Sequence, residues 1–212
     1  LGHRGVAQMW VTFNGRSVHA SVPEKAKNPN YALADFLQKL QACQGELSTH
    51  ELLGPTTVSP TIIEVDTKSQ NVTPARTRLL LDFRTASEST SSLKAFIRDL
   101  AGDWPITITD GLCAEPGTAV ADSDELIYGY YTPAESDVVV RAQAAIASGM
   151  GREPALTRYN FATDGRHFVP YDLPIIGYAP SEEAQAHVAD ESISIAKMGE
   201  SLRGHVQLLR DF

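Results

Sequence analysis

Apolar and polar side chains alternate along several stretches of the first half of the chain. Apolar side chains occupy every second position of residues 6–13 and of residues 77–84, which is typical of strands with one buried face. Residues 56–65 are rich in Thr, Val and Ile, and residues 105–109 form a shorter run of the same kind. Because β-branched residues favour the pleated backbone, we expect four strands in this half of the chain.

Two further stretches have helical spacing. Apolar residues recur every three or four positions over about 30–44 and again over about 89–101. The expected order is therefore strand, helix, strand, strand, helix, strand. Two helices on one face of a four-stranded antiparallel sheet make the ferredoxin-like βαββαβ arrangement. We expect residues 1–112 to fold as one compact α+β unit of this kind.

The second half of the chain has a less regular pattern. Residues 113–135 combine Pro, Gly and acidic residues without a period, and we interpret them as a linker. Helices are expected over about 136–149 and 190–210, and strands over 155–161 and 173–178. Alternating helices and strands favour α/β layering with a parallel sheet. Since these few elements cannot cover both faces of such a sheet, we expect the sequence to be a piece of a longer protein.

Composition narrows the classes of protein. The 212 residues carry a formal net charge of −8 and a pI near 5.2, without any run of Lys and Arg, which argues against a nucleic-acid partner. We identify neither a leader nor an apolar run of the roughly 18–20 residues that cross a bilayer. Cys43 and Cys113 are far apart and form no metal-binding pair, which suits a reducing compartment. We therefore expect a cytoplasmic protein without membrane association.

Three polar side chains of the first half could carry chemistry. His19 is either an exposed turn residue or an imidazole that polarises a carbonyl group. Arg84 points away from the apolar face of its strand, and Asn71 lies in the loop before that strand. A guanidinium and an amide suit recognition of a carboxylate. The alternative is a surface Arg84 that pairs with Asp82 or Glu88.

The second half offers two candidates. His187 lies between the expected strand 173–178 and the last expected helix. Such a position is common for a metal ligand, but the spacing alone favours the alternative, a polar loop residue. Thr163, Asp164 and Gly165 form either an Asx-type turn and nothing more or, in a cleft, a lining for a substrate amide. The sequence contains no nucleophile elbow, phosphate-binding loop, dinucleotide fingerprint or HExxH motif.

Several motifs, taken in order, resemble one family. They are Gly15–Pro23 (GRSVHASVP), Asn71–Pro74 (NVTP), Asp82–Arg84 (DFR), Thr163-Asp164, Pro174–Gly177 (PIIG) and Ala186–Glu191 (AHVADE). The chain resembles the dizinc amidohydrolases of peptidase family M20, which include aminoacylases, acetylornithine deacetylases, succinyl-diaminopimelate desuccinylases and glutamate carboxypeptidases. Its GHRG and YNFATDG segments are similar to a branch linked to selenium metabolism.

The resemblance implies a two-part fold. Residues 1–112 would be a ferredoxin-like lid and dimerisation domain, inserted in an α/β zinc-peptidase catalytic domain. Residues 113–212 would be the C-terminal portion of that catalytic domain. The lid would form a homodimer, in which His19 reaches the active site of a partner subunit and polarises the scissile carbonyl, with Asn71 beside it.

The resemblance also implies the other site residues. Arg84 would bind the substrate carboxylate, and Thr163, Asp164 and Gly165 would line the pocket. His187 would be a ligand to one of two zinc ions in a complete subunit, with cobalt or manganese as alternatives. The other metal ligands and the glutamate general base would belong to an N-terminal half that is absent from this sequence.

The implied function is hydrolysis of an amide bond by a metal-activated water. The substrate would be a small molecule with a free carboxylate: a dipeptide, an N-acyl amino acid or an N-carbamoyl amino acid. The turn Ala179-Pro180-Ser181 departs from the Gly-Pro-Gly that is usual in relatives. That departure motivates an alternative, a catalytically incomplete relative that acts as a dimerisation or small-molecule-binding module. We expect these 212 residues alone to have little activity.

Overall fold

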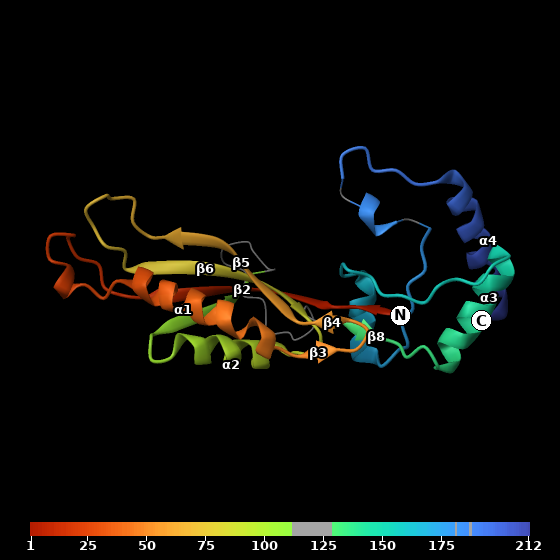
Figure 1. Cartoon of the computed structure of the whole chain (residues 1–212), viewed down its shortest axis with the longest axis horizontal. Helices are drawn as coiled ribbons and strands as arrows, with labels where there is room; N and C mark the ends of the chain where they lie inside the picture. Colours follow the sequence, from red (N-terminus) through yellow and green to blue (C-terminus); the bar gives the residue numbers. More distant parts are fainter. Residues whose placement is uncertain (112–128, 181, 187) are drawn as a thin grey trace. The chain divides into compact units, whose positions relative to one another are not determined.

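The computed structural model of the protein describes residues 1–111, 129–180, 182–186 and 188–212. The chain folds as two compact units, one of Gly5–Tyr128 and one of Leu1–Arg4 together with Gly129–Phe212 (Figure 1). The predicted boundary between residues 112 and 113 falls outside the described residues. The assignment of a lid and a catalytic portion to either side of it therefore stays a prediction.

The first unit contains a four-stranded antiparallel sheet with the strand order β5-β6-β2-β7. Its strands are β2 (Gly5–Asn14), β5 (Thr57–Val65), β6 (Arg76–Thr85) and β7 (Ile106–Asp110). Helices α1 (Pro29–Cys43) and α2 (Thr90–Ala101) cover one face of this sheet (Figure 1). The order of elements along the chain and across the sheet is that of the ferredoxin-like fold, so this prediction is confirmed.

The core of the first unit lies between the sheet and its two helices. Every second side chain of β2 and β6 enters it, including the fully buried Met9, Phe13 and Leu81. From α1, the ring of Phe36 meets that of Phe13 edge-on, with 5.4 Å between centroids, and α2 contributes Ile97. Burial of each large apolar side chain stabilises the fold by about 1.5–3 kcal/mol. The period-two pattern therefore fixes which strand face turns inward and which is left for polar groups.

Local chemistry fixes the ends of α2. The Ser89 hydroxyl accepts a hydrogen bond from the backbone N–H of Ser92, and the Ser92 hydroxyl accepts one from the N–H of Ser89. This reciprocal cap satisfies two donors that a helix start leaves open. At the other end Gly102 has a φ of 57°, a conformation that favours glycine. Between α1 and β5, a short hairpin pairs β3 (Thr49–His50) with β4 (Gly54–Pro55).

The second unit is built mainly on two helices, α3 (Asp137–Met150) and α4 (Ile195–Asp211). They pack closely at Gly149, where a Cβ atom would lie 2.4 Å from the carbonyl oxygen of Arg203. A two-stranded antiparallel sheet pairs β1 (Gly2–His3) with β8 (Tyr130–Tyr131). A 3-10 helix spans Asp164–Tyr171, and a shorter one spans Glu183–Gln185.

Three expectations for the second half are wrong. Residues 155–161 and 173–178 form no strand, and the described part of the second unit contains no parallel sheet. Ile175, in the second of these stretches, exchanges its backbone hydrogen bonds with a side chain, the hydroxyl of Thr132. A strand needs a neighbouring strand to satisfy its backbone N–H and C=O groups, and an apolar run does not by itself supply one.

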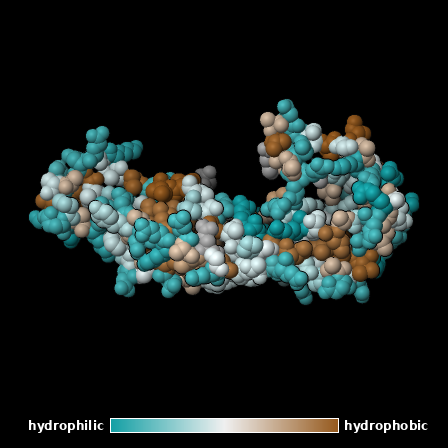
Figure 2. Space-filling model, viewed as in Figure 1, coloured by the Kyte–Doolittle hydropathy of each residue, from teal (hydrophilic) through white to brown (hydrophobic). Residues whose placement is uncertain are grey.

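Apolar side chains also lie along an uncovered side of α4. Ile195, Leu202 and Leu209 are 86%, 65% and 82% exposed. In the space-filling view, hydrophobic side chains reach the surface over α3 and near the start of α4 (Figure 2). Among the residues that the structure describes, no helix is both long enough and apolar enough to cross a membrane.

Candidate active-site residues

His19 lies in the loop that follows β2, and Asn71 lies in the loop between β5 and β6. These two loops lie at the same end of the sheet (Figure 1). Backbone hydrogen bonds join the loops, from Ala20 N to Asn71 O at 2.8 Å and from Thr73 N to Val18 O at 2.9 Å. The side-chain nitrogen of Asn71 lies 3.3 Å from His19 Nε2. The structure thus brings together two predicted site residues that are 52 positions apart in the sequence.

Short contacts hold both side chains in place. The Ser21 hydroxyl lies 2.8 Å from His19 Nδ1, and the Ser21 backbone N–H donates to the same nitrogen at 3.2 Å. The Ser69 hydroxyl donates to Asn71 Oδ1 at 2.7 Å. The loop itself depends on Gly15, because a Cβ there would lie 2.1 Å from the carbonyl oxygen of Lys27. An imidazole and an amide side by side can donate to an oxygen that gains negative charge.

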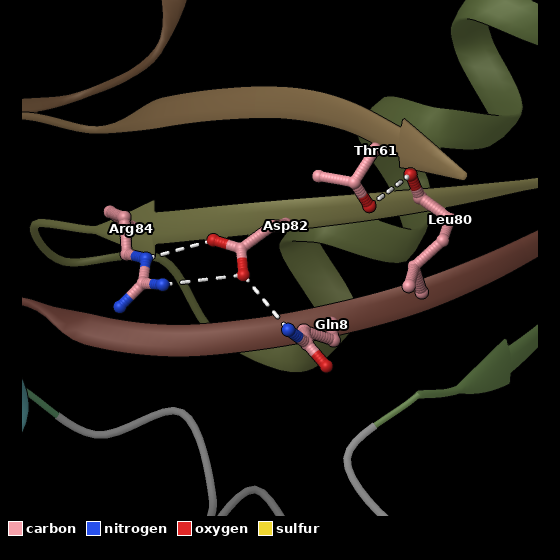
Figure 3. Close-up of polar contacts among 5 residues, drawn as sticks. All are labelled: Gln8, Thr61, Leu80, Asp82 and Arg84. Carbon is pink, nitrogen blue, oxygen red and sulfur yellow. Dashed lines mark hydrogen bonds and ion pairs between the residues drawn. The ribbon is translucent and has the colours of Figure 1, made fainter.

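Arg84 lies on β6, on the sheet face that the helices leave open (Figure 3). Its Nε and one terminal nitrogen donate to the two oxygens of Asp82, at 2.8 and 3.3 Å, and Gln8 Nε2 donates to Asp82 Oδ2 at 2.9 Å. This pairing is one of the two alternatives drawn from the sequence. The Arg84 side chain is nonetheless 40% exposed, so solvent or a ligand can reach the guanidinium.

Glu88, the other carboxylate considered for Arg84, belongs to a separate network. It accepts hydrogen bonds from the backbone N–H and the hydroxyl of Ser48, at 2.9 and 2.6 Å, and from the hydroxyl of Thr56. Burial acts to raise the pKa of Glu88, but these hydrogen bonds to the charged form outweigh it and hold the pKa below its ordinary value. Glu88 therefore ties loops of the first unit together.

Arg84 and the pair of His19 and Asn71 lie toward opposite ends of the sheet. The loop that carries His19 leaves β2 at Asn14, which pairs with Arg76 at the start of β6. Arg84 lies eight residues further along β6, and at about 3.3 Å per residue this corresponds to about 26 Å. One copy of this unit cannot present both groups to one small substrate.

Thr163, Asp164 and Gly165 open the 3-10 helix of the second unit. The Thr163 hydroxyl accepts from the N–H of Gly165 at 3.3 Å and caps the helix, while the side chain of Asp164 is fully exposed. The N–H of Thr163 donates to His3 Nε2 at 3.0 Å, and His3 Nδ1 lies 2.8 Å from the carbonyl oxygen of Arg4. The backbone of this turn is thus held by a histidine from the first strand.

No pattern in the sequence connects His3 with this turn. It is fully buried, and its ring meets the ring of Tyr130 edge-on at 4.6 Å. Burial lowers the pKa of His3, and because Nε2 accepts the Thr163 hydrogen bond only without a proton, the neutral ring is the form that fits. The contact joins residues 160 positions apart, so no local pattern could reveal it.

His187, the predicted metal ligand, lies outside the described residues. Nearby, the 3-10 helix Glu183–Gln185 ends at Ala186, and Asp190 has a φ of 62°. Within residues 1–111, 129–180, 182–186 and 188–212, no group of three His, Cys, Asp or Glu side chains could hold a metal ion. The described side chains therefore do not by themselves fit the dizinc site that the resemblance implies.

Most of the first unit matches a known protein family. Residues 1–103 match the family model of the peptidase dimerisation domain, M20_dimer. Over these residues the chain is similar to the dimerisation domains of M20 peptidases. His19, Asn71 and Arg84 all lie within the matched residues.

Relatives extend the similarity beyond the M20 dimerisation domain. The chain is 28% identical to succinyl-diaminopimelate desuccinylase 2 of Ruegeria sp. and 27% identical to succinyl-diaminopimelate desuccinylase of Dinoroseobacter shibae. Both alignments cover all of this chain and 51% and 53% of the relatives. The chain thus spans about half the length of the curated relatives it matches.

Solved structures share the fold. Aminopeptidase PepT of Bacillus cereus matches with a TM-score of 0.72 at 16% identity, and a tripeptidase of Staphylococcus aureus with 0.67 at 14%. Each match covers 99% of this chain and 52% of the other chain. At this level of identity the likeness concerns the fold alone, and it includes residues both within and beyond the matched stretch 1–103.

Proposed function

We propose that this chain is part of a metal-dependent amidohydrolase that cleaves an amide bond in a small, carboxylate-bearing substrate. The similarity to M20 dimerisation domains supports this, as do relatives named for removal of a succinyl group and fold neighbours named as peptidases. Dipeptides, N-acyl amino acids and N-carbamoyl amino acids fit the description. A cytoplasmic location belongs to the same proposal.

The observation that carries the proposal is the separation of polar groups along the lid sheet. His19 and Asn71 lie beyond one end of β6, and Arg84 lies near the other, about 26 Å along the strand from Arg76. A small substrate can meet both ends only if they come from two copies of the chain. We therefore propose a homodimer in which each active site takes His19 and Asn71 from one subunit and Arg84 from the other.

Strand β5 is the natural place for the two lids to meet. Among the residues that the structure describes, it is an edge strand of the sheet, paired on one side with β6. Its Ile62 and Ile63 are exposed. An edge strand with exposed apolar side chains is a template for pairing with another chain, and a dimerisation domain that pairs there would extend its sheet.

The proposed roles follow from the chemistry of each group. The N–H donor of His19, with Asn71 beside it, would stabilise the oxygen of the scissile carbonyl as it gains negative charge. Arg84, oriented by Asp82, would bind the substrate carboxylate. Thr163, Asp164 and Gly165 would line the pocket, with exposed Asp164 at its surface.

The proposed metal is zinc, two ions in a complete subunit, with cobalt or manganese as alternatives. When bound, it would activate the attacking water. His187 is the one candidate ligand in this chain, and the described residues supply no cluster to complete its site. The chain's own proposed contribution is therefore substrate binding and stabilisation of charge.

Mixed dimers test this proposal in the complete protein. His19→Ala and Arg84→Ala homodimers should each lose most activity on a carboxylate-bearing amide. In a mixed dimer one site receives both intact groups, so random mixing should restore about a quarter of wild-type activity. No recovery on mixing, with mixed dimers confirmed by mass, would overturn the two-copy site. A wild-type protein that dimerises without hydrolysing any amide would favour the dimerisation or binding module instead.

A further inference from the structure

One residue makes two contacts with the same ring nitrogen of His19. The hydroxyl of Ser21 lies 2.8 Å from His19 Nδ1, and the backbone N–H of Ser21 donates to that nitrogen at 3.2 Å. A backbone N–H can only donate, so Nδ1 must offer a lone pair. The Ser21 hydroxyl can rotate to donate to the same nitrogen. A neutral imidazole held in this way carries its proton on Nε2.

The other ring nitrogen faces Asn71. Its side-chain amide lies 3.3 Å from His19 Nε2. An Nε2–H donor needs an acceptor there, and Asn71 offers Oδ1 when its amide is turned by about 180°, since the two ends of an amide are nearly alike in shape. The turned amide also satisfies Ser69, whose hydroxyl, 2.7 Å from the amide, can accept as well as donate.

We infer that Ser21 is a positioning residue, which keeps the proton of neutral His19 on Nε2 so that this N–H is available to the substrate carbonyl. The inference deepens the proposed function and rests on it for the role of His19. As the carbonyl oxygen gains charge it becomes a stronger acceptor than the neutral amide of Asn71, because hydrogen bonds to ionised groups are the stronger ones. The opposite tautomer would turn a lone pair toward that oxygen and repel it.

The same chain contains reference histidines for both tautomers. His50 Nδ1 accepts from the backbone N–H groups of Leu52 and Leu53, both at 3.2 Å, so His50 carries its proton on Nε2. His205 Nδ1 lies 2.8 Å from the carbonyl oxygen of Ser201. A carbonyl oxygen only accepts, so His205 carries its proton on Nδ1.

Nitrogen-15 NMR of the imidazole groups tests the inference without any assay of activity. The spectra are recorded on the 212-residue chain at about pH 8, where an ordinary imidazole is neutral, and the signals of His19 are assigned by their loss in His19→Gln. We expect the coupling pattern of His19 to match that of His50 and to be the reverse of that of His205. A His19 pattern like that of His205 would overturn the inference.

Variants of Ser21 distinguish its effect on the tautomer of His19 from the tautomer preference of an imidazole without that contact. Ser21→Ala removes one of two donors and should lower the ratio of the Nε2–H to the Nδ1–H form about fivefold, the effect of one ordinary hydrogen bond. Ser21→Asp places an acceptor at Nδ1 and should shift the proton toward it. Ser17→Ala, an exposed serine of the same loop, should change nothing. An unchanged His19 pattern in both Ser21 variants would refute the role of Ser21.

The complete protein supplies a second, separable readout. Ser21→Ala should lower kcat in proportion to the fraction of His19 in the Nε2–H form, by less than the fivefold change in the tautomer ratio and with little change in KM, while Ser17→Ala should leave both unchanged. If His19→Ala has full activity, the proposed function of His19 fails while the NMR result on Ser21 still stands. If His19→Ala is inactive and Ser21→Ala shifts the tautomer without lowering kcat, the positioning role fails while the proposed function stands.

Discussion

The two units of the chain differ in what happens to an apolar helix face. In the first unit α1 turns Leu33, Phe36 and Leu40 onto the sheet, where they are buried. In the second unit α4 has apolar spacing that is as regular, yet Ile195 and Leu209 face solvent. Helical periodicity therefore tells which face of a helix is apolar. It does not tell whether the same chain supplies the surface that covers that face.

The largest expected effect comes from the same truncation in each unit. Leu81→Ala removes a fully buried side chain of β6 and should lower the free energy of unfolding of the first unit by about 2–5 kcal/mol. Leu209→Ala removes a largely exposed side chain of α4 and should change the free energy of unfolding by no more than about 0.5 kcal/mol. Urea unfolding of both variants measures this. Equal decreases in the free energy of unfolding for the two variants would contradict the proposed difference between the units.

A smaller effect is expected where the second unit does pack tightly. Gly149→Ala would place a Cβ 2.4 Å from the backbone of Arg203, and should destabilise the contact of α3 with α4 by about 1–3 kcal/mol. Gly199→Ala is the matched control, because its Cβ would lie 3.9 Å from the flexible end of Arg203. There the better helix propensity should stabilise α4 by up to about 1 kcal/mol. Thermal unfolding of the two variants should show shifts of opposite sign.

The third prediction concerns pH. The expected change in the free energy of unfolding is the smallest of the three near neutral pH. Burial lowers the pKa of His3 below its usual value of 6.5, so the unfolded chain takes up a proton before the folded one does. The second unit should therefore be fully stable above about pH 6.5 and lose stability as the pH falls, by at most about 1.4 kcal/mol for each pH unit. His3→Gln should remove this part of the pH dependence. The measurement is chemical unfolding at a series of pH values, and an unchanged slope in His3→Gln would contradict it.

The first unit could be predicted from the sequence nearly element by element. The strands expected over 6–13 and 77–84 are Gly5–Asn14 and Arg76–Thr85, and the helix expected over 89–101 is Thr90–Ala101. The reason is physical. Each of these elements buries one face against others of the same unit, so the periodicity of its apolar residues and its fold agree.

The second half could not be predicted to the same degree. Residues 173–178 have the composition of a buried strand, but the described chain provides no neighbouring strand, and Ile175 bonds to Thr132 instead. The last helix begins at Ile195, five residues later than expected at 190, because Ser194 caps it, with its hydroxyl accepting from Lys197 N. Capping residues are common in loops, so the choice among them depends on contacts that the sequence does not display.

The candidate site divides in the same way. The pairing of Arg84 with Asp82 joins residues two positions apart on one strand, and the sequence offered it as an alternative. The approach of His19 to Asn71 and that of His3 to Thr163 depend on how distant segments meet. Motif resemblance named His19, Asn71 and Thr163, since motifs preserve such sets without showing the geometry. His3 and Ser21 lie within the GHRG and GRSVHASVP segments, but the resemblance assigned no role to either, because their importance lies in contacts.

The length of β6 has a consequence for how the protein would behave in solution. A strand cannot stretch, so under the proposed two-copy arrangement no motion within one subunit can substitute for the second subunit. Formation of one active site would then require two copies of the chain to associate. Specific activity would fall on dilution below the dissociation constant of the dimer, as mass action requires. A substitution at the exposed edge of β5 that weakens dimerisation would then abolish the proposed activity without changing any group that contacts the substrate. The reason is that only the dimer would contain a complete site.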